Sequence, residues 1–132
     1  MLRELKILKG RSIAMLGFAF KPNTDDLRDA PALDIARQLI QKGACVTATD
    51  PVALGNARRF YPELGVTYCD TPREALQAAD AIVLVTEWPE YRKLNWTEIK
   101  SMLANPLILD GRNFLERVEL ERLGYRYFGV GR

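Results

Sequence analysis

Short apolar runs alternate with amphipathic stretches along the whole chain. Six of the runs have the length of β-strands, and residues 81–85 (AIVLV) are apolar without interruption. An uninterrupted apolar run is typical of a parallel strand that is covered on both faces. The predicted strands are residues 12–18, 45–49, 66–68, 81–85, 107–109 and 125–128.

The stretches between these strands carry helix signals. Residues 32–41 place apolar side chains at helical spacing, and Gly43 follows as a stop. Thr71-Pro72-Arg73-Glu74 is a capping box with proline at the first helical position, and it opens a predicted helix that reaches residue 79. Further helices are predicted from residue 95 or 96 to residue 103 and over residues 118–123.

This alternation predicts an α/β fold. We expect a doubly wound, mainly parallel, Rossmann-like sheet of about five or six strands with helices on both faces. At 132 residues the chain fits one domain. Residues 1–10 have no partner element in the pattern, so we interpret them as the remnant of an interdomain connection and residues 11–132 as the domain.

Ligands of doubly wound sheets bind beyond the carboxyl ends of the strands. The segments that follow the predicted first and fifth strands carry three cations, Lys21, Arg28 and Arg112. Arginine and lysine are suited to phosphate, so their convergence would form an anion site for a diphosphate. The alternative is that they are ordinary solvated loop charges paired with Asp25, Asp26 and Asp110.

Composition narrows the class of partner. Nineteen Lys and Arg against seventeen Asp and Glu give a net charge of +2, too small to indicate nucleic acid or a membrane surface. No apolar run approaches the ~18 residues that span a bilayer, and the start of the chain lacks a signal peptide, so we expect a cytoplasmic protein. The absence of histidine excludes a His-dependent nucleophile or zinc site, and we predict no metal site.

An NAD site confined to this chain is not favoured. A dinucleotide fingerprint needs G-x-G-x-x-G after the first strand, and here the stretch is GFAFKP, with two of three glycines missing. Asp50, after the second strand, imitates the acid that binds the ribose. Phe20 and Trp88 could stack on a base or sugar, but packing is the favoured role of Trp88. Cys45 and Cys69 are interpreted as small strand residues.

Several motifs together resemble the C-terminal domain of the UDP-glucose/GDP-mannose dehydrogenase family. They are residues 17–28 (GFAFKPNTDDLR), 31–34 (PALD), 48–51 (ATDP), 86–90 (TEWPE) and 110–113 (DGRN). The resemblance extends from about residue 9 to residue 132. It implies an enzyme that oxidises a nucleotide sugar to the uronate with two NAD per turnover, through a catalytic cysteine. The TDD and TEW forms resemble the members that act on UDP-glucose, while GDP-mannose and UDP-N-acetylmannosamine stay open as substrates.

The resemblance also implies site residues. Phe20, Lys21 and Arg112 match positions that bind the nucleotide sugar, and Arg28 matches a position that reaches NAD. NAD itself would be bound mainly by an N-terminal domain that this chain lacks, as it lacks the segment with the catalytic cysteine. We therefore predict no catalytic residue here, no activity of the chain in isolation, and a homo-oligomeric full-length enzyme.

Two other classes of function remain open on the sequence. One is a stand-alone, non-catalytic protein that binds a nucleotide sugar or regulates another protein. The other is an independent NAD-dependent enzyme, for which binding of the nicotinamide cofactor by this chain is the minimum requirement.

Overall fold

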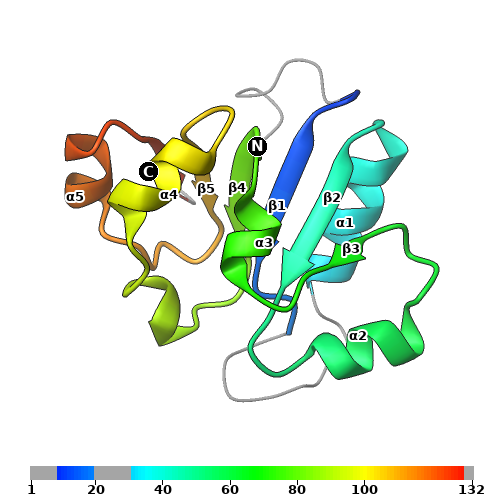
Figure 1. The fold of residues 1–132 in the computed structure, drawn as a ribbon. Helices are drawn as coiled ribbons and strands as arrows, with labels where there is room; N and C mark the ends of the chain where they lie inside the picture. The colour runs from blue at the N-terminus through cyan, green and yellow to red at the C-terminus, as the bar shows by residue number, and fades with distance from the viewer. Residues whose placement is uncertain (1–8, 20–30, 130–132) are drawn as a thin grey trace.

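A six-stranded parallel sheet forms the centre of the molecule (Figure 1). The computed structural model describes residues 9–19 and 31–129. Within these residues all strand pairs are parallel, and the strand order is β3-β2-β1-β4-β5-β6. The strands are β1 (Ser12–Leu16), β2 (Cys45–Thr49), β3 (Thr67–Tyr68), β4 (Ala81–Leu84), β5 (Leu107–Asp110) and β6 (Arg126–Gly129). The predicted parallel, Rossmann-like sheet is confirmed.

Both faces of the sheet are buried, as the continuous apolar runs predict. Alternate residues of β1 point to opposite faces, so that Ile13 and Met15 belong to one core cluster while Ala14 and Leu16 belong to the other. All four residues of β4 are buried. Each core cluster needs a layer of helices to cover it.

The helices divide between the two faces of the sheet, and their order along the chain decides which face each one covers. One core cluster contains buried residues of the first two helices, α1 (Pro31–Gln41) and α2 (Leu54–Phe60). The other contains those of α3 (Pro72–Leu76), α4 (Trp96–Met102) and α5 (Arg117–Arg122). Right-handed crossovers place helices on opposite faces once strand order reverses between β1 and β4. In Figure 1, α3 and α4 lie in front of the sheet and α1 lies behind it.

Two local signals in the sequence have the structural effect that they predict. Thr71 caps α3, because its Oγ1 accepts a hydrogen bond from the N–H of Glu74 at 3.2 Å, and Pro72 occupies the first turn. Gly43 ends the turn after α1 with φ +90°, a conformation that favours glycine.

Two elements were not predicted. The helix α2 contains Gly55 and Asn56, both poor helix formers, and its N-cap Ala53 has no side-chain capping bond. The 3₁₀-helix η1 (Pro89–Tyr91) follows a strand end where only a loop is expected. Tertiary packing stabilises both elements, because Leu54, Ala57 and Tyr91 are buried.

The boundaries of the predicted elements agree to within a few residues. The first strand ends at Leu16 and not at residue 18, because Gly17 turns the chain with φ +92°.

The described residues contain no helix that is long and apolar enough to cross a membrane. The proposed division at residue 10 stays a prediction, since residues 1–8 lie outside the described part of the chain.

Candidate functional site

The carboxyl ends of the strands carry the residues that the sequence singles out. Strand order reverses between β1 and β4, which is the position where doubly wound sheets bind ligands. The loops after β1, β2, β4 and β5 therefore meet at one edge of the sheet. Gly17, Asp50, Thr86 and Asp110 lie at these ends or within two residues beyond them.

The turn after β1 is packed tightly against the end of β4. A Cβ atom on Gly17 would lie 2.5 Å from the Cβ of Thr86, so only glycine fits there. The Thr86 hydroxyl donates a hydrogen bond to the carbonyl of Ala19 at 2.7 Å, and the Gly17 N–H donates to the carbonyl of Thr49 at 2.8 Å. In the described part of this turn, these polar groups thus form hydrogen bonds within the protein.

Asp50 accepts further hydrogen bonds from this turn. Its buried carboxylate accepts five hydrogen bonds from the loops that follow β1, β2 and β4. The donors are the N–H groups of Phe18 (2.8 Å), Ala19 (3.0 Å), Val52 (2.9 Å) and Ala53 (2.9 Å) and the indole N–H of Trp88 (3.1 Å). A carboxylate with this many partners fixes the loops, and the packing role that the sequence favours for Trp88 agrees with its burial.

These contacts bear on NAD, which the family resemblance implies. In a dinucleotide site the backbone N–H groups of the β1 turn point to the pyrophosphate. Here the N–H groups of Gly17, Phe18 and Ala19 donate to protein oxygens, and Asp50 is occupied by loop donors. The described turn therefore does not fit a dinucleotide cradle.

The loop after β5 is built around a second buried aspartate. Asp110 Oδ1 accepts from the N–H of Arg112 at 2.9 Å, and Oδ2 accepts from the N–H groups of Phe114 and Leu115, each at 2.8 Å. The Tyr127 hydroxyl, from β6, also donates to Oδ2 at 2.6 Å. Asp110 thereby fixes the backbone from which the Arg112 side chain leaves.

Arg112 lies beside the ends of two strands. Its Nε–H is 3.2 Å from the carbonyl oxygen of Val85 and 3.3 Å from Glu87 Oε2, and the two charged side chains are 33% and 34% exposed. Among the described residues, Glu87 thus forms an ion pair with Arg112. Asp110, one of the three partners in the sequence alternative, accepts a hydrogen bond from the backbone N–H of Arg112, and the other two, Asp25 and Asp26, lie outside the described residues.

A pocket of about 280 Å³ lies next to Arg112. Its walls are mainly apolar and come from α1 and from the carboxyl ends of β4, β5 and β6, including Ile35, Val85, Leu109 and Phe128. Phe128 keeps 37% of its surface exposed. An apolar pocket that is lined by a cation, here Arg112, can hold a flat or apolar group attached to an anion.

Only one of the four predicted site residues lies in the part of the chain that the structure describes. Arg112 lines the pocket, whereas Phe20, Lys21 and Arg28 lie outside the described residues. Glu87 and Phe128 were not predicted as site residues. Glu87 had a signal in the sequence, because it follows the fourth predicted strand within the TEW motif, but nothing in the pattern of residues pairs it with Arg112.

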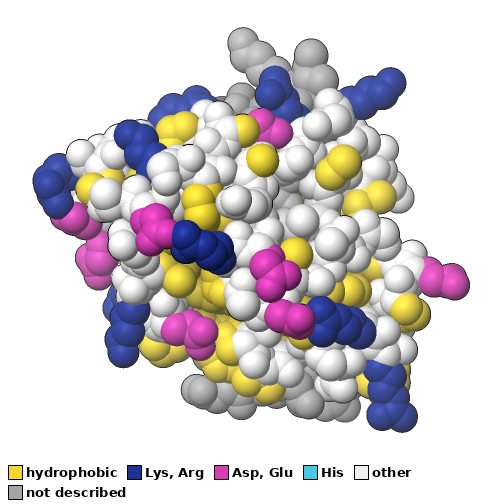
Figure 2. All heavy atoms as spheres, viewed as in Figure 1, with side chains coloured by type: hydrophobic (Ala, Val, Ile, Leu, Met, Phe, Trp, Pro, Cys, Tyr) yellow, Lys and Arg dark blue, Asp and Glu magenta, His cyan; other side chains and the backbone are white. Residues whose placement is uncertain are grey.

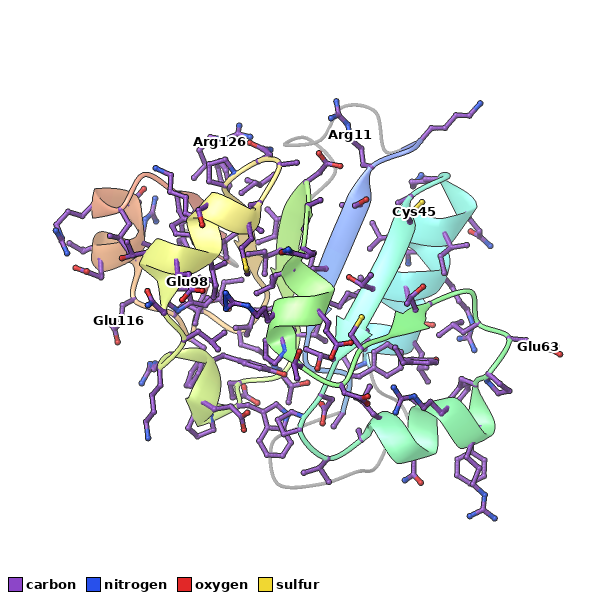
Figure 3. All side chains as sticks on the ribbon, viewed as in Figure 1. Arg11, Cys45, Glu63, Glu98, Glu116 and Arg126 are labelled. Carbon is purple, nitrogen blue, oxygen red and sulfur yellow. The ribbon has the colours of Figure 1, made fainter. Side chains whose placement is uncertain are left out.

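The two cysteines lie away from this pocket. Both are free, and neither lines it. Figure 3 shows Cys45 at the start of β2, beside Arg11 at the amino-end edge of the sheet. Burial raises the pKa of the Cys69 thiol, with smaller contributions from neighbouring carboxylates, which disfavours the nucleophilic thiolate. The described residues contain no group of three or more His, Cys, Asp or Glu that could hold a metal ion.

The surface carries no dominant charge on the face seen in Figure 2. Acidic and basic side chains are interspersed there, with apolar atoms between them. Most of the ion pairs join exposed side chains, for example Arg58 with Asp70 at 2.9 Å. With a net charge of +2, an anion site in this protein has to depend on a few nearby cations and not on the charge of the whole surface.

Sequence comparison finds close relatives of this chain among known proteins. The chain is 40% identical over 124 residues to the UDP-glucose 6-dehydrogenase of Rickettsia bellii and 43% identical over 125 residues to that of Bacillus subtilis. These matches cover 94% and 95% of the chain but only 29% and 27% of the relatives, so the chain spans less than a third of their length.

Solved structures give the same result. A UDP-glucose dehydrogenase from Pyrobaculum islandicum aligns with 98% of the chain at a TM-score of 0.79 and 33% identity, and the match covers 27% of that protein. An NDP-N-acetyl-D-galactosaminuronic acid dehydrogenase from Methanosarcina mazei aligns with 98% of the chain at a TM-score of 0.84 and 36% identity, covering 26% of that protein.

The sequence profile of one family covers most of the described residues. Residues 14–117 match the UDP-glucose/GDP-mannose dehydrogenase family in its UDP binding domain. This range contains the turn after β1, the Asp50 network and the loop with Arg112. The chain belongs to the UDP-glucose/GDP-mannose dehydrogenase family and represents its UDP-binding domain.

Proposed function

We propose that the chain is the nucleotide-sugar-binding domain of an NAD-dependent UDP-glucose 6-dehydrogenase. The observation that carries the proposal is that Arg112 lines the apolar pocket on the carboxyl edge of the sheet. UDP-glucose is favoured as the ligand because the relatives from Rickettsia bellii and Bacillus subtilis are UDP-glucose 6-dehydrogenases at 40% and 43% identity.

The chemistry of the pocket suits a nucleotide. The exposed ring of Phe128 offers a face on which a base can stack, and Ile35 and Leu109 add apolar surface. The guanidinium of Arg112 supplies charge-assisted hydrogen bonds to a phosphate oxygen or to the sugar beyond it. A volume of about 280 Å³ lies slightly below the usual range of small-molecule sites, which is consistent with a domain that forms one wall of a larger cleft.

Three further contacts belong to the proposal. We assign Phe20 and Lys21 to the nucleotide sugar and Arg28 to NAD, following the family resemblance of residues 17–28. NAD would act as the hydride acceptor when bound. It would be held mainly by a domain outside this chain, because the described β1 turn does not fit a dinucleotide. The chain alone would then bind the nucleotide sugar without oxidising it.

The test is a titration of the chain with UDP-glucose, followed by amide chemical shifts in NMR spectra. We expect weak binding, with Kd on the order of 1 mM, because only one wall of the cleft is present while the entropic cost of association is undiminished. The shifts should concentrate at residues 110–113 and at Phe128. They should be small at Cys45 and Arg126, which lie at the opposite edge of the sheet (Figure 3).

Arg112→Ala should weaken binding by about tenfold or more, since it removes charge-assisted bonds. Arg126→Ala is the matched control, because it removes the same charge from an exposed position at the amino end of β6. UDP-N-acetylmannosamine and GDP-mannose are titrated in parallel to test the preference for UDP-glucose. Absence of any shift change at millimolar ligand, or equal losses in both variants, would refute the proposed site.

The complete enzyme has two further proposed properties. We propose a homo-oligomer in the cytoplasm, which sedimentation and microscopy of the tagged full-length protein would check. Addition of UDP-glucose and NAD to the isolated chain should give no NADH absorbance, and any enzyme-dependent increase would favour the independent dehydrogenase instead.

A further inference from the structure

Glu87 places a carboxylate directly beside the cation of the proposed site. Its Oε2 lies 3.3 Å from Arg112 Nε, and the same Nε–H also faces the carbonyl oxygen of Val85 at 3.2 Å. The two acceptors come from the segment that follows β4, while Arg112 comes from the loop after β5. Neighbouring strands therefore hold the two opposite charges together at the edge of the sheet.

The pair is only partly shielded from solvent. The side chains of Arg112 and Glu87 are 33% and 34% exposed, so a ligand can approach the guanidinium and encounter the carboxylate as well. An anion at Arg112 is attracted by one charge and repelled by the other. The net attraction depends on how much negative charge the ligand carries near Glu87.

Free UDP and a UDP-sugar differ in this property. A terminal phosphate has a second pKa near 6, so it carries close to two negative charges at neutral pH, whereas a phosphate esterified to a sugar carries one. The sugar also presents hydroxyl donors in place of the second charge. A carboxylate is an acceptor of hydrogen bonds and a poor neighbour for a dianion.

We propose that Glu87 is a specificity-determining residue that makes the Arg112 site prefer an esterified diphosphate over a free one. The proposal rests on the proposed function, in which Arg112 contacts the phosphate or sugar end of the ligand. Glu87 accepts hydrogen bonds from sugar hydroxyls and repels a terminal phosphate. The site thereby favours the nucleotide sugar over the nucleoside diphosphate, its most similar competitor.

The test compares the dissociation constants of UDP and UDP-glucose for the wild-type chain and for Glu87→Gln. Glutamine keeps an acceptor oxygen for Arg112 and removes the charge. We expect UDP to bind about three- to tenfold more tightly to the variant, as removal of one charge within several ångströms predicts at an effective dielectric constant between protein and water. UDP-glucose should bind equally well or more weakly. The ratio of the Kd of UDP to the Kd of UDP-glucose should fall by at least about threefold.

Glu90→Gln is the matched control. Glu90 is exposed in the same β4–α4 connection, and the substitution changes the net charge by the same amount. Its ratio should stay within about twofold of the wild type. Melting temperatures of both variants show whether either substitution disturbs the fold, and a change in stability by itself would not alter the ratio.

The outcomes separate the two proposals. If the wild type binds neither ligand, the proposed function fails. If the wild type binds both and Arg112→Ala weakens both, an unchanged ratio in Glu87→Gln overturns the specificity role alone. An equal fall of the ratio in Glu90→Gln also overturns it, because the effect would then come from net charge and not from the contact with Arg112.

Discussion

Replacement of Asp50 by asparagine tests whether one carboxylate organises the carboxyl edge of the sheet. The buried side chain of Asp50 uses both oxygens to accept hydrogen bonds from three loops. Oδ2 accepts from Phe18, Ala19 and Trp88, and Oδ1 accepts from Val52 and Ala53. Asparagine has nearly the same shape but only one acceptor oxygen.

The magnitude follows from counting donors. If the amide oxygen takes the position of Oδ2, its NH₂ group faces the N–H groups of Val52 and Ala53. In the opposite orientation it faces three donors. At least two donors therefore lose their acceptor, and each loss costs about 1–3 kcal/mol when the group is buried. Val52 is partly exposed, which lowers its share, so we expect Asp50→Asn to reduce the free energy of unfolding by about 2–5 kcal/mol.

The assay is urea unfolding followed by far-UV circular dichroism, with the m-value compared between variants. Asp70→Asn is the control, because Asp70 is an exposed carboxylate paired with Arg58 at 2.9 Å, and its loss should cost less than about 0.5 kcal/mol. The reasoning is refuted if the two variants differ by less than about 1 kcal/mol, which is the smallest cost of one orphaned buried donor.

Three other substitutions or reactions test separate features. Gly17→Ala should destabilise the chain by about 3 kcal/mol or more in the same urea assay, because φ is +92° and the added Cβ would lie 2.5 Å from Thr86; a loss below 1 kcal/mol would contradict the contact. Tyr127→Phe removes the hydroxyl donor to Asp110 and should lower the melting temperature, with a loss of about 1–2 kcal/mol. Burial raises the pKa of the Cys69 thiol in the folded chain above its value in the unfolded chain. The contribution of this thiol to the stability of the fold is therefore complete below the unfolded pKa and is lost as pH rises through the folded pKa. Near neutral pH a thiol reagent should modify Cys69 only after unfolding, as mass spectrometry would show.

Most of the sheet could be predicted because its signals are local. Residues 81–85 are apolar throughout, and the strand observed over Ala81–Leu84 lies within that run. Thr71 Oγ1 accepts its capping bond from the N–H of Glu74 within one turn, so the sequence spacing is sufficient to predict this bond. The helix α2 could not be predicted in this way, because its own residues favour it weakly and its stability comes from packing.

The role of Asp50 could not be read from its neighbours in the sequence. Its donors Phe18, Ala19 and Trp88 are 32, 31 and 38 residues away. The sequence offered only a resemblance to the ribose-binding acid of a dinucleotide site. The structure assigns the carboxylate to the loops, since its oxygens already accept five hydrogen bonds.

The sequence alone determined the fold class and the absence of a dinucleotide fingerprint after the first strand, and it predicted the sheet edge at which a ligand would bind, because each depends on residue type and spacing along the chain. The tertiary structure decided which side chains meet at that edge. Parallel register places Leu84 beside Asp110 and Asp110 beside Gly129, which brings the residues after β4 and β5 together at the end of β6. Arg112 consequently pairs with Glu87 and lines a pocket with Phe128, contacts that no local pattern could specify.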